Sequence, residues 1–170
     1  NHMTKEKHNV LKQIGIKIIT IIISSTLLLV SCNNQRNIYS EYRPIEQCLW
    51  HEDSLLTYSI FIEDTSSAYD VFLNVRHVET YPFQNLWFFI SHSNANHSHI
   101  TLDTIEFYLA NDRGAWLGNG RNGIIEMPVL YEQNYHFNQI GEQHYTIQHG
   151  MRDSLLRGIY DVGIIIKKNE

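Results

Sequence analysis

Three histidines within eight residues are the first side chains in this sequence that could do chemistry. His92, His97 and His99 offer imidazole nitrogens, and His97 and His99 would share one face of an extended strand. Three imidazoles can hold zinc or copper and leave one position open for water. The segment Ser91–Ser98 is polar and turn-rich, however, with no nearby cysteine and no clear orienting carboxylate. We therefore interpret it as a solvated hairpin tip and expect no metal and no other cofactor.

The second candidate is a glycine pattern. Residues Gly118–Gly123 read G-x-G-x-x-G, the spacing with which some folds cradle a pyrophosphate. That chemistry requires a preceding strand and a following helix whose N-terminus receives the phosphates. Here the following segment, Ile124–Tyr131, is β-like and contains Pro128. The pattern is better interpreted as a glycine-rich turn of a β protein.

No arrangement typical of nucleophilic or acid–base catalysis stands out. The G-x-S-x-G elbow is absent from the sequence, and no cysteine is suited to act as a nucleophile. Adjacent acids, such as Glu52 with Asp53 and Glu63 with Asp64, fall in segments that look like strand ends and turns. We expect no enzymatic activity.

Aromatic residues at expected loop positions are candidates for binding. Tyr81, Phe83 and Trp116 each lie close to a proline or glycine, and Arg113 and Arg121 flank Trp116. Aromatic and arginine side chains often dominate protein contacts, so these five residues form the predicted partner site. An equally good interpretation is that the aromatics plug the end of a β core. Trp50, Trp87 and Trp116, with ten tyrosines, also allow a stacking platform for a glycan.

The elements that must position these groups show the period of two that is typical of strands. Apolar residues alternate with polar ones in five segments, at 56–62, 69–76, 86–90, 105–109 and 161–166. Turn-forming residues lie between them, at 63–67, 91–94 and 111–114. No sustained helical stripe follows the first 31 residues. The pattern predicts an all-β chain, a single antiparallel β-sandwich of seven to nine strands.

The N-terminal segment has the features of a secretion signal. Four lysines precede a short apolar run, Ile18–Val30, which is shorter than the roughly 20 residues that a membrane span needs. It ends in Leu29-Val30-Ser31-Cys32, which resembles the lipobox of bacterial lipoproteins. That resemblance implies that Cys32 is acylated and becomes the new N-terminus. Residues 1–31 are then the signal peptide, with Asn1 and His2 upstream of the first plausible start, Met3.

Cleavage before Cys32 changes the charge of the chain. Residues 1–31 hold four lysines and one glutamate, so the mature chain keeps 9 basic and 17 acidic residues, a net charge of −8. No basic cluster remains, which argues against nucleic acid as a partner. The remaining cysteine, Cys48, has no partner for an intramolecular disulfide. We expect a lipidated N-terminus and polar spacer over 32–37 and one globular domain over 38–170.

Several blocks of residues occur in an order typical of one family. Among them are Trp50-His51-Glu52-Asp53-Ser54, Tyr81-Pro82-Phe83-Gln84-Asn85-Leu86, Gly114-Ala115-Trp116-Leu117-Gly118-Asn119-Gly120 and Tyr145-Thr146-Ile147-Gln148-His149-Gly150-Met151-Arg152. With the lipobox, they resemble the gliding-motility lipoprotein GldH family of the Bacteroidetes, from about residue 38 to residue 166. The resemblance implies a lipoprotein that acts with other envelope or motility proteins, with the outer membrane as its expected location. It implies no catalytic or metal-binding residues.

Three triplets resemble the Asp-Ser/Thr-apolar site at which bacteria of that phylum attach O-glycans. Their hydroxyl residues are Ser54, Thr104 and Ser154. Coincidence is the other explanation, because such triplets are common in strand-and-turn proteins.

Two functions remain open from the sequence. In the first, the chain is a non-enzymatic, lipid-anchored envelope protein that binds partner proteins. In the second, it is a lipid-anchored module that binds a glycan or another small ligand. Exposed, coplanar aromatics in a groove would favour the second function, and an apolar patch at one end of the sandwich would favour the first.

Overall fold

The computed structural model describes residues 36–96 and 100–169 of the chain. The predicted signal peptide and Cys32 lie outside this range, as do His97 and His99. Within it, one short 3-10 turn, Glu46–Cys48, accompanies eleven strands. The strands are β1 (Arg36–Pro44), β2 (Leu49–His51), β3 (Leu56–Ile62), β4 (Tyr69–Val78), β5 (Asn85–Asn94), β6 (Ile100–Tyr108), β7 (Asn119–Arg121), β8 (Ile124–Tyr135), β9 (Gly141–His149), β10 (Leu155–Arg157) and β11 (Ile159–Lys168).

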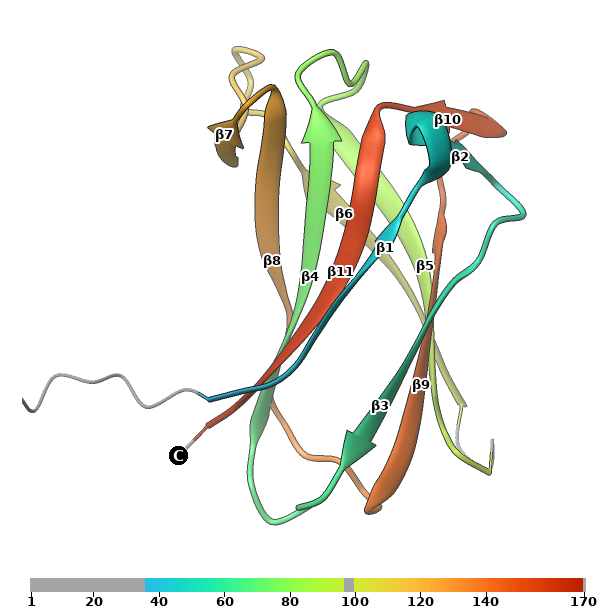
Figure 1. Ribbon diagram of the computed structural model, residues 1–170, viewed down its shortest axis with the longest axis vertical. Coiled ribbons are helices and arrows are strands. Elements are labelled where there is room, and N and C mark those ends of the chain that lie inside the picture. Colours follow the sequence, from blue (N-terminus) through green and yellow to red (C-terminus); the bar gives the residue numbers. More distant parts are fainter. Residues whose placement is uncertain (1–35, 97–99, 170) are drawn as a thin grey trace, which may run out of the picture. The chain divides into compact units, whose positions relative to one another are not determined.

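The strands form two main antiparallel sheets (Figure 1). One sheet has the order β1-β11-β4-β8-β7 and the other the order β3-β9-β5-β6, while β2 and β10 form a separate pair. Eight of the strands in the described residues have seven residues or more, and β2, β7 and β10 have three each. The predicted all-β antiparallel fold is confirmed. The predicted count of seven to nine strands is too low, because the three short strands bring the number in the described residues to eleven. One boundary shifts: β1 begins at Arg36, inside the segment expected to be a spacer, because Arg36 and Asn37 pair with Lys168 and Lys167.

The core lies between the inner faces of the two sheets, where the apolar positions of the alternating segments meet. Tyr58, Ile60 and Ile62 of β3 are buried, and so are Val162, Ile164 and Ile166 of β11. The hydroxyl of Tyr58 donates a hydrogen bond to Val162 O at 2.7 Å, which joins the sheets across the core. Because strand side chains point alternately to the two faces, the period of two in the sequence predicts this burial pattern.

The expected turn at Ser91–Asn94 is wrong, because β5 continues through it. Ser91, His92 and Ser93 pair with Leu102, Thr101 and Ile100 of β6, and β9 pairs on the other side. Both neighbours satisfy the backbone of this polar segment, so it extends the strand rather than ending it. Trp87 and Phe89, earlier in the same strand, lie on the outer face of β5 and are 36% and 47% exposed. β5 is a central strand of its sheet, between β9 and β6.

The outer face of the five-stranded sheet carries a polar network. Arg76 of β4 donates two hydrogen bonds to Asp161 of β11 and lies over the ring of Tyr42, 4.3 Å from its centroid. That ring packs against Gly163, where a Cβ would come within 2.7 Å of it. Asn74 donates to Tyr42 Oη at 2.6 Å. Asp161 and Asn74 are 3% and 2% exposed, so this face is covered by side chains of its own sheet.

The sandwich has two ends, the Arg36 end and the Trp116 end, each named after one of its residues. At the Arg36 end, β1 begins, β11 ends, and the connections 63–68 and 136–140 join strands. At the Trp116 end lie the connections 79–84, 109–118 and 150–154, with the pair β2 and β10 (Figure 1).

Candidate functional site

The loops that carry the predicted contact residues meet at the Trp116 end. Tyr81 and Phe83 come from the connection 79–84, and Trp116 comes from the connection 109–118. The ring centroids of Tyr81 and Phe83 lie 5.8 Å apart, and those of Tyr81 and Trp116 lie 6.4 Å apart. Gln84 O accepts hydrogen bonds from the backbone N–H groups of Leu109, at 2.7 Å, and Ala110, at 3.1 Å. The two loops are therefore joined by backbone as well as by rings.

Tyr81 is not the exposed loop residue that the sequence suggested. Its side chain is 4% exposed, and its hydroxyl donates to Asn85 O at 3.0 Å. Burial raises the pKa of this hydroxyl above its ordinary value. Gly158 lies against the Tyr81 backbone with a φ of +94°, where a Cβ would come within 3.1 Å of Tyr81 Cα. This burial favours the alternative that the sequence left open, in which Tyr81 plugs the end of the core, and its contact with a partner stays a prediction.

Trp116 is half-buried over the core. Its ring packs against His77, with centroids 4.5 Å apart and planes inclined by 62°. Gly118 lies so close to Glu126 O that a Cβ would collide with this backbone atom, which explains the glycine two residues after the tryptophan. Trp116 thus acts partly as a plug, the alternative that the sequence left open. Leu117 beside it is 51% exposed.

The rings of His77 and His149 lie under this end. The Nδ1 atom of His77 is 3.0 Å from Val78 O, and the Nε2 atom of His149 is 3.1 Å from Trp50 O. Burial lowers the pKa of both rings, opposed by these hydrogen bonds. Their remaining ring nitrogens are buried and have no hydrogen-bond partner among residues 36–96 and 100–169. Both rings pack against aromatic side chains, an environment that suits packing and not proton transfer.

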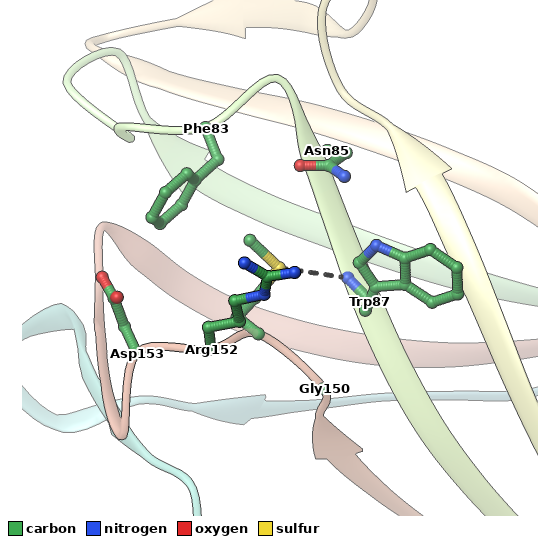
Figure 2. Close-up of a pocket in the computed structure, with 7 residues that line it drawn as sticks. Phe83, Asn85, Trp87, Gly150, Arg152 and Asp153 are labelled. Carbon is green, nitrogen blue, oxygen red and sulfur yellow. Dashed lines mark hydrogen bonds between the residues drawn. The ribbon is translucent and has the colours of Figure 1, made fainter.

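A groove with a volume of about 560 Å³ opens beside these loops. Its lining residues come from two distant parts of the chain and are Phe83, Asn85, Trp87, Gly150, Met151, Arg152 and Asp153. Figure 2 shows Phe83 and Trp87 on opposite sides of Arg152 in its view. The volume is within the range of small-ligand pockets, and the lining combines two aromatic rings with one cation and one anion.

Backbone contacts fix the floor of the groove. Gly150 N donates to Trp87 O at 2.6 Å, and Trp87 N donates to the sulfur of Met151 at 3.4 Å (Figure 2). A Cβ at Gly150 would come within 3.1 Å of Phe89 Cζ and 3.2 Å of Trp87 Cβ. A side chain at this position would press on both residues, so glycine lets the end of β9 lie this close to Phe89 and Trp87 without displacing them. Asn85 donates to Glu106 Oε1 at 2.6 Å, which holds the β6 side of the groove.

The sequence pattern did not predict this groove. It indicated Trp87 as a possible stacking residue and did not single out Arg152 or Asp153 as binding residues. The sequence feature that could have indicated the groove is Gly150, which follows a strand and precedes a Met-Arg-Asp segment. Phe83 is the one groove residue that was predicted as a contact. Arg113 and Arg121 are exposed at the same end but do not line the groove.

The histidine cluster differs from the expected solvated tip. His92 is only 9% exposed and stacks on Tyr145, with ring centroids 4.2 Å apart and planes 4° apart. Its Nε2 atom lies 3.1 Å from Gln143 Oε1. His97 and His99 lie outside the described residues, so their part of the interpretation stays a prediction. Over residues 36–96 and 100–169, no group of three His, Cys, Asp or Glu side chains is arranged to hold a metal ion.

The glycine pattern forms a hairpin. Asn119–Arg121 is β7, and the turn passes through Asn122 and Gly123, with φ values of +52° and +77°, into β8. An Asn-Gly turn with both φ angles positive is typical of a tight β-hairpin. A strand follows where a pyrophosphate site needs a helix, so this segment lacks the geometry for that ligand.

The three predicted glycosylation residues, Ser54, Thr104 and Ser154, are all exposed. Ser54 and Ser154 lie on neighbouring turns, because Glu52 N donates to Ser154 O at 2.8 Å. Accessibility is a requirement for modification, and all three positions meet it.

Comparison with known proteins places the domain in a family. The family model described as GldH lipoprotein matches residues 37–166. The chain belongs to the GldH lipoprotein family. It is 33% identical to the gliding motility lipoprotein GldH homolog of Christiangramia forsetii, over 88% of this chain and 94% of that protein. It is 30% identical to the gliding motility lipoprotein GldH of Flavobacterium johnsoniae, over 88% of this chain and 96% of that protein. These matches confirm the family resemblance predicted from the sequence.

Membership of a lipoprotein family supports a membrane-anchored location in the cell envelope. The GldH relatives are named as lipoproteins and not as enzymes. In the part of the chain that the structure describes, no helix is long and apolar enough to cross a membrane.

Solved structures resemble the domain only weakly. Latent PorU from Porphyromonas gingivalis has a TM-score of 0.34 and 10% identity, over 82% of this chain and 14% of that chain. The CBM35 module of Cellvibrio japonicus Abf62 has a TM-score of 0.33 and 10% identity, over 78% of this chain and 99% of that chain. Similarity at this level carries no argument about function.

Proposed function

We propose that this GldH-family lipoprotein is a non-enzymatic component of the envelope, anchored in the outer membrane through lipid on Cys32. It supports gliding motility or a related envelope machinery by binding a partner protein at the Trp116 end. Family membership supports the first part of the proposal. The observation that carries the second is the groove, where Gly150 is hydrogen-bonded to Trp87 and Arg152 lines the same cavity.

The groove has the composition of a protein contact. Trp87 is 36% exposed and Phe83 half-buried, and Tyr108, which pairs with Asn85, is 61% exposed beside them. Aromatic and arginine side chains at the centre of a patch carry most of the affinity in protein complexes. Arg152 and Asp153 add charges of opposite sign, which fix the orientation of a partner more than its affinity. Because hydrogen bonds already hold the backbone N–H and C=O of Trp87, little backbone freedom is lost at this residue on binding.

The test replaces groove residues on the chromosome of a gliding host that depends on the protein. Trp87→Ala and Arg152→Ala should reduce gliding or envelope assembly, while the protein stays folded and membrane-bound. Leu130→Ala is the matched control, because Leu130 is an exposed apolar residue, 43% accessible, on the other sheet. A photo-crosslinker at position 87 should give one discrete adduct that Arg152→Ala weakens. Full motility in both groove variants would show that the partner binds elsewhere.

A glycan or another small ligand is the second candidate, and the mixed lining of the groove favours it. Trp87 offers a face for stacking, while Asn85, Arg152 and Asp153 offer hydrogen bonds. Titration with envelope glycans should then change the fluorescence of Trp87 at concentrations where Trp87→Ala shows no response. A protein adduct at position 87 together with no glycan response would decide for the first function.

A further inference from the structure

The start of β1 limits how far the domain can lie from its lipid anchor. Three residues, Asn33, Asn34 and Gln35, separate Cys32 from Arg36. Four fully extended residues span at most about 14 Å. Arg36 is not part of a free tail, because it pairs with Lys168 of β11. If Cys32 carries lipid, as proposed above, the Arg36 end of the sandwich is held within this distance of the bilayer.

This end exposes large apolar side chains on fixed backbone. Ile140, in the connection between β8 and β9, is 64% exposed. The same connection is held by Phe137, which is 2% exposed and packs against Tyr69 and Tyr135 with ring centroids 5.3 and 4.9 Å apart. The buried ring fixes the connection, so Ile140 is displayed on a supported loop.

Two further apolar side chains lie on the same end. Phe61 is 64% exposed and Ile38 is 39% exposed. Both line a shallow cavity of about 380 Å³ with Arg36, Tyr69 and Lys168. Ile38 stands at the register shift between Asn37 and Tyr39 in the pairing of β1 with β11. The exposed apolar residues thus begin two positions after the first residue of the sandwich.

The charges of this end show which kind of membrane contact it can make. Its basic residues are Arg36, Lys167 and Lys168. Three acidic residues match them: Asp64, which pairs with Lys168 at 2.8 Å, Glu63, which lines the same cavity, and Glu142, which is exposed opposite Phe61. A chain with a net charge of −8 and no basic excess here gains little from anionic lipid. Attachment therefore depends on apolar side chains, because Lys168 is paired with Asp64 and Lys167 lies over the ring of Phe72, 4.7 Å from its centroid.

We infer that the Arg36 end docks on the surface of the bilayer that holds the lipid of Cys32, with Ile140, Phe61 and Ile38 in its interfacial layer. The inference rests on the lipid anchor proposed above. A short tether makes this contact intramolecular, so its effective concentration is high and a weak apolar contact is enough. Aromatic and aliphatic side chains are favoured at this depth. Docking then turns the Trp116 end, with its groove, away from the lipid.

The native tryptophans provide a built-in control for the test. Trp50, Trp87 and Trp116 all belong to the Trp116 end, so a tryptophan placed at Ile140 is the reporter for the other end. The full lipidated protein is reconstituted in phosphatidylcholine vesicles, with or without lipid brominated near the top of the acyl chain. We expect the emission added by Ile140→Trp to be quenched by the brominated lipid. The emission of the native protein, and that added by Leu117→Trp, should not change.

Three outcomes would overturn the inference. If the lipidated protein does not float with the vesicles, the anchor at Cys32 is wrong and the inference falls with it. If the protein floats but the emission added by Ile140→Trp is not quenched, the anchor stands and the docking is wrong. If that emission instead changes when the protein is diluted among more vesicles, a second copy of the chain covers this face.

A second variant tests the contact without relying on the reporter. Ile140→Asp with Phe61→Ser removes the apolar contact at two exposed positions. The doubly substituted protein should keep its lipid and float, but the vesicles should no longer protect this end from a protease that cuts the connection 136–140 in solution. Equal protection of the native and substituted proteins would contradict the inference.

Discussion

The indole of Trp116 packs edge-on against the buried ring of His77, with centroids 4.5 Å apart. His77 belongs to β4 in the middle of the five-stranded sheet, whereas Trp116 lies 39 residues later in the chain, in the connection 109–118. This contact ties the 109–118 connection to the core. It makes Trp116 a structural residue at least as much as a binding residue.

Trp116→Ala should therefore lower stability. Complete truncation of a buried tryptophan costs about 3–5 kcal/mol, and Trp116 is half-buried, so a cost of about 2 kcal/mol is expected. The melting temperature should fall by roughly 5 to 10 °C. Leu117→Ala, at the exposed neighbouring position, should change stability by less than about 0.5 kcal/mol. Equal melting temperatures for Trp116→Ala and the parent would show that the loop is not anchored by this ring.

Stability should fall in mild acid because of the buried histidines. Burial lowers the pKa of His77 and His149 in the folded state below the ordinary value of 6.5. The unfolded chain therefore binds more protons as the pH falls below 6.5. Their stabilising contribution is complete above that pH and is lost as the pH falls through the folded values. Denaturant unfolding measured across this pH range gives the slope of the unfolding free energy against pH. His77→Gln and His149→Gln should each reduce this slope. A slope unchanged in both variants would assign the acid sensitivity to other groups.

Breaking the pair between Arg76 and Asp161 should be costly. Arg76→Met leaves Asp161, 3% exposed, without its counter-charge, and loss of one partner of a buried pair costs on the order of 3 kcal/mol. The double variant Arg76→Met with Asp161→Asn should recover part of this lost stability, because it no longer buries an unpaired charge. The control is Glu41→Gln, which removes an exposed pair with Arg43 and should cost less than about 1 kcal/mol. If Arg76→Met and Glu41→Gln lower the free energy of unfolding by similar amounts, Asp161 is better hydrated than its burial indicates.

Cys32→Ala should release the protein from the membrane. Without the thiol no thioether can form, so labelled palmitate should not be incorporated and the protein should leave the detergent phase. Cys48→Ala is the matched control, because Cys48 is the free cysteine of the β domain and should not affect partitioning. A Cys32→Ala protein that still enters the detergent phase would show that another element anchors the chain.

Glycosylation at Ser54, Thr104 and Ser154 should be visible in the intact mass. Protein from the native host is expected to exceed the mass of the lipidated polypeptide, and the excess should disappear when the three residues are replaced by Ala, Val and Ala. All three side chains are exposed, so the substitutions should leave the fold intact. A native mass equal to that of the lipidated chain alone would rule out the modification.

The sequence by itself determined the class of fold and the family. In β3, for example, Tyr58, Ile60 and Ile62 are buried as their alternation predicts, because each strand residue faces the side opposite to its neighbours. The glycine hairpin at 122–123 was also readable, since a turn depends on residues that are adjacent in the chain. The lipobox and the ordered blocks of residues are likewise local features of the chain, and they are enough to indicate the GldH family.

Only the tertiary structure decided which residues meet. The groove joins Trp87 to Arg152 because β9 pairs with β5, and strand order is a property of the whole sheet rather than of either segment. The same holds for Tyr81, which neighbouring loops bury, and for His92, which lies between two pairing strands and stacks on Tyr145. Polar and aromatic residues near turns look alike in the sequence whether they are exposed or covered. Their burial depends on contacts between segments far apart in the chain, and the periodicity of a single strand carries no information about those contacts.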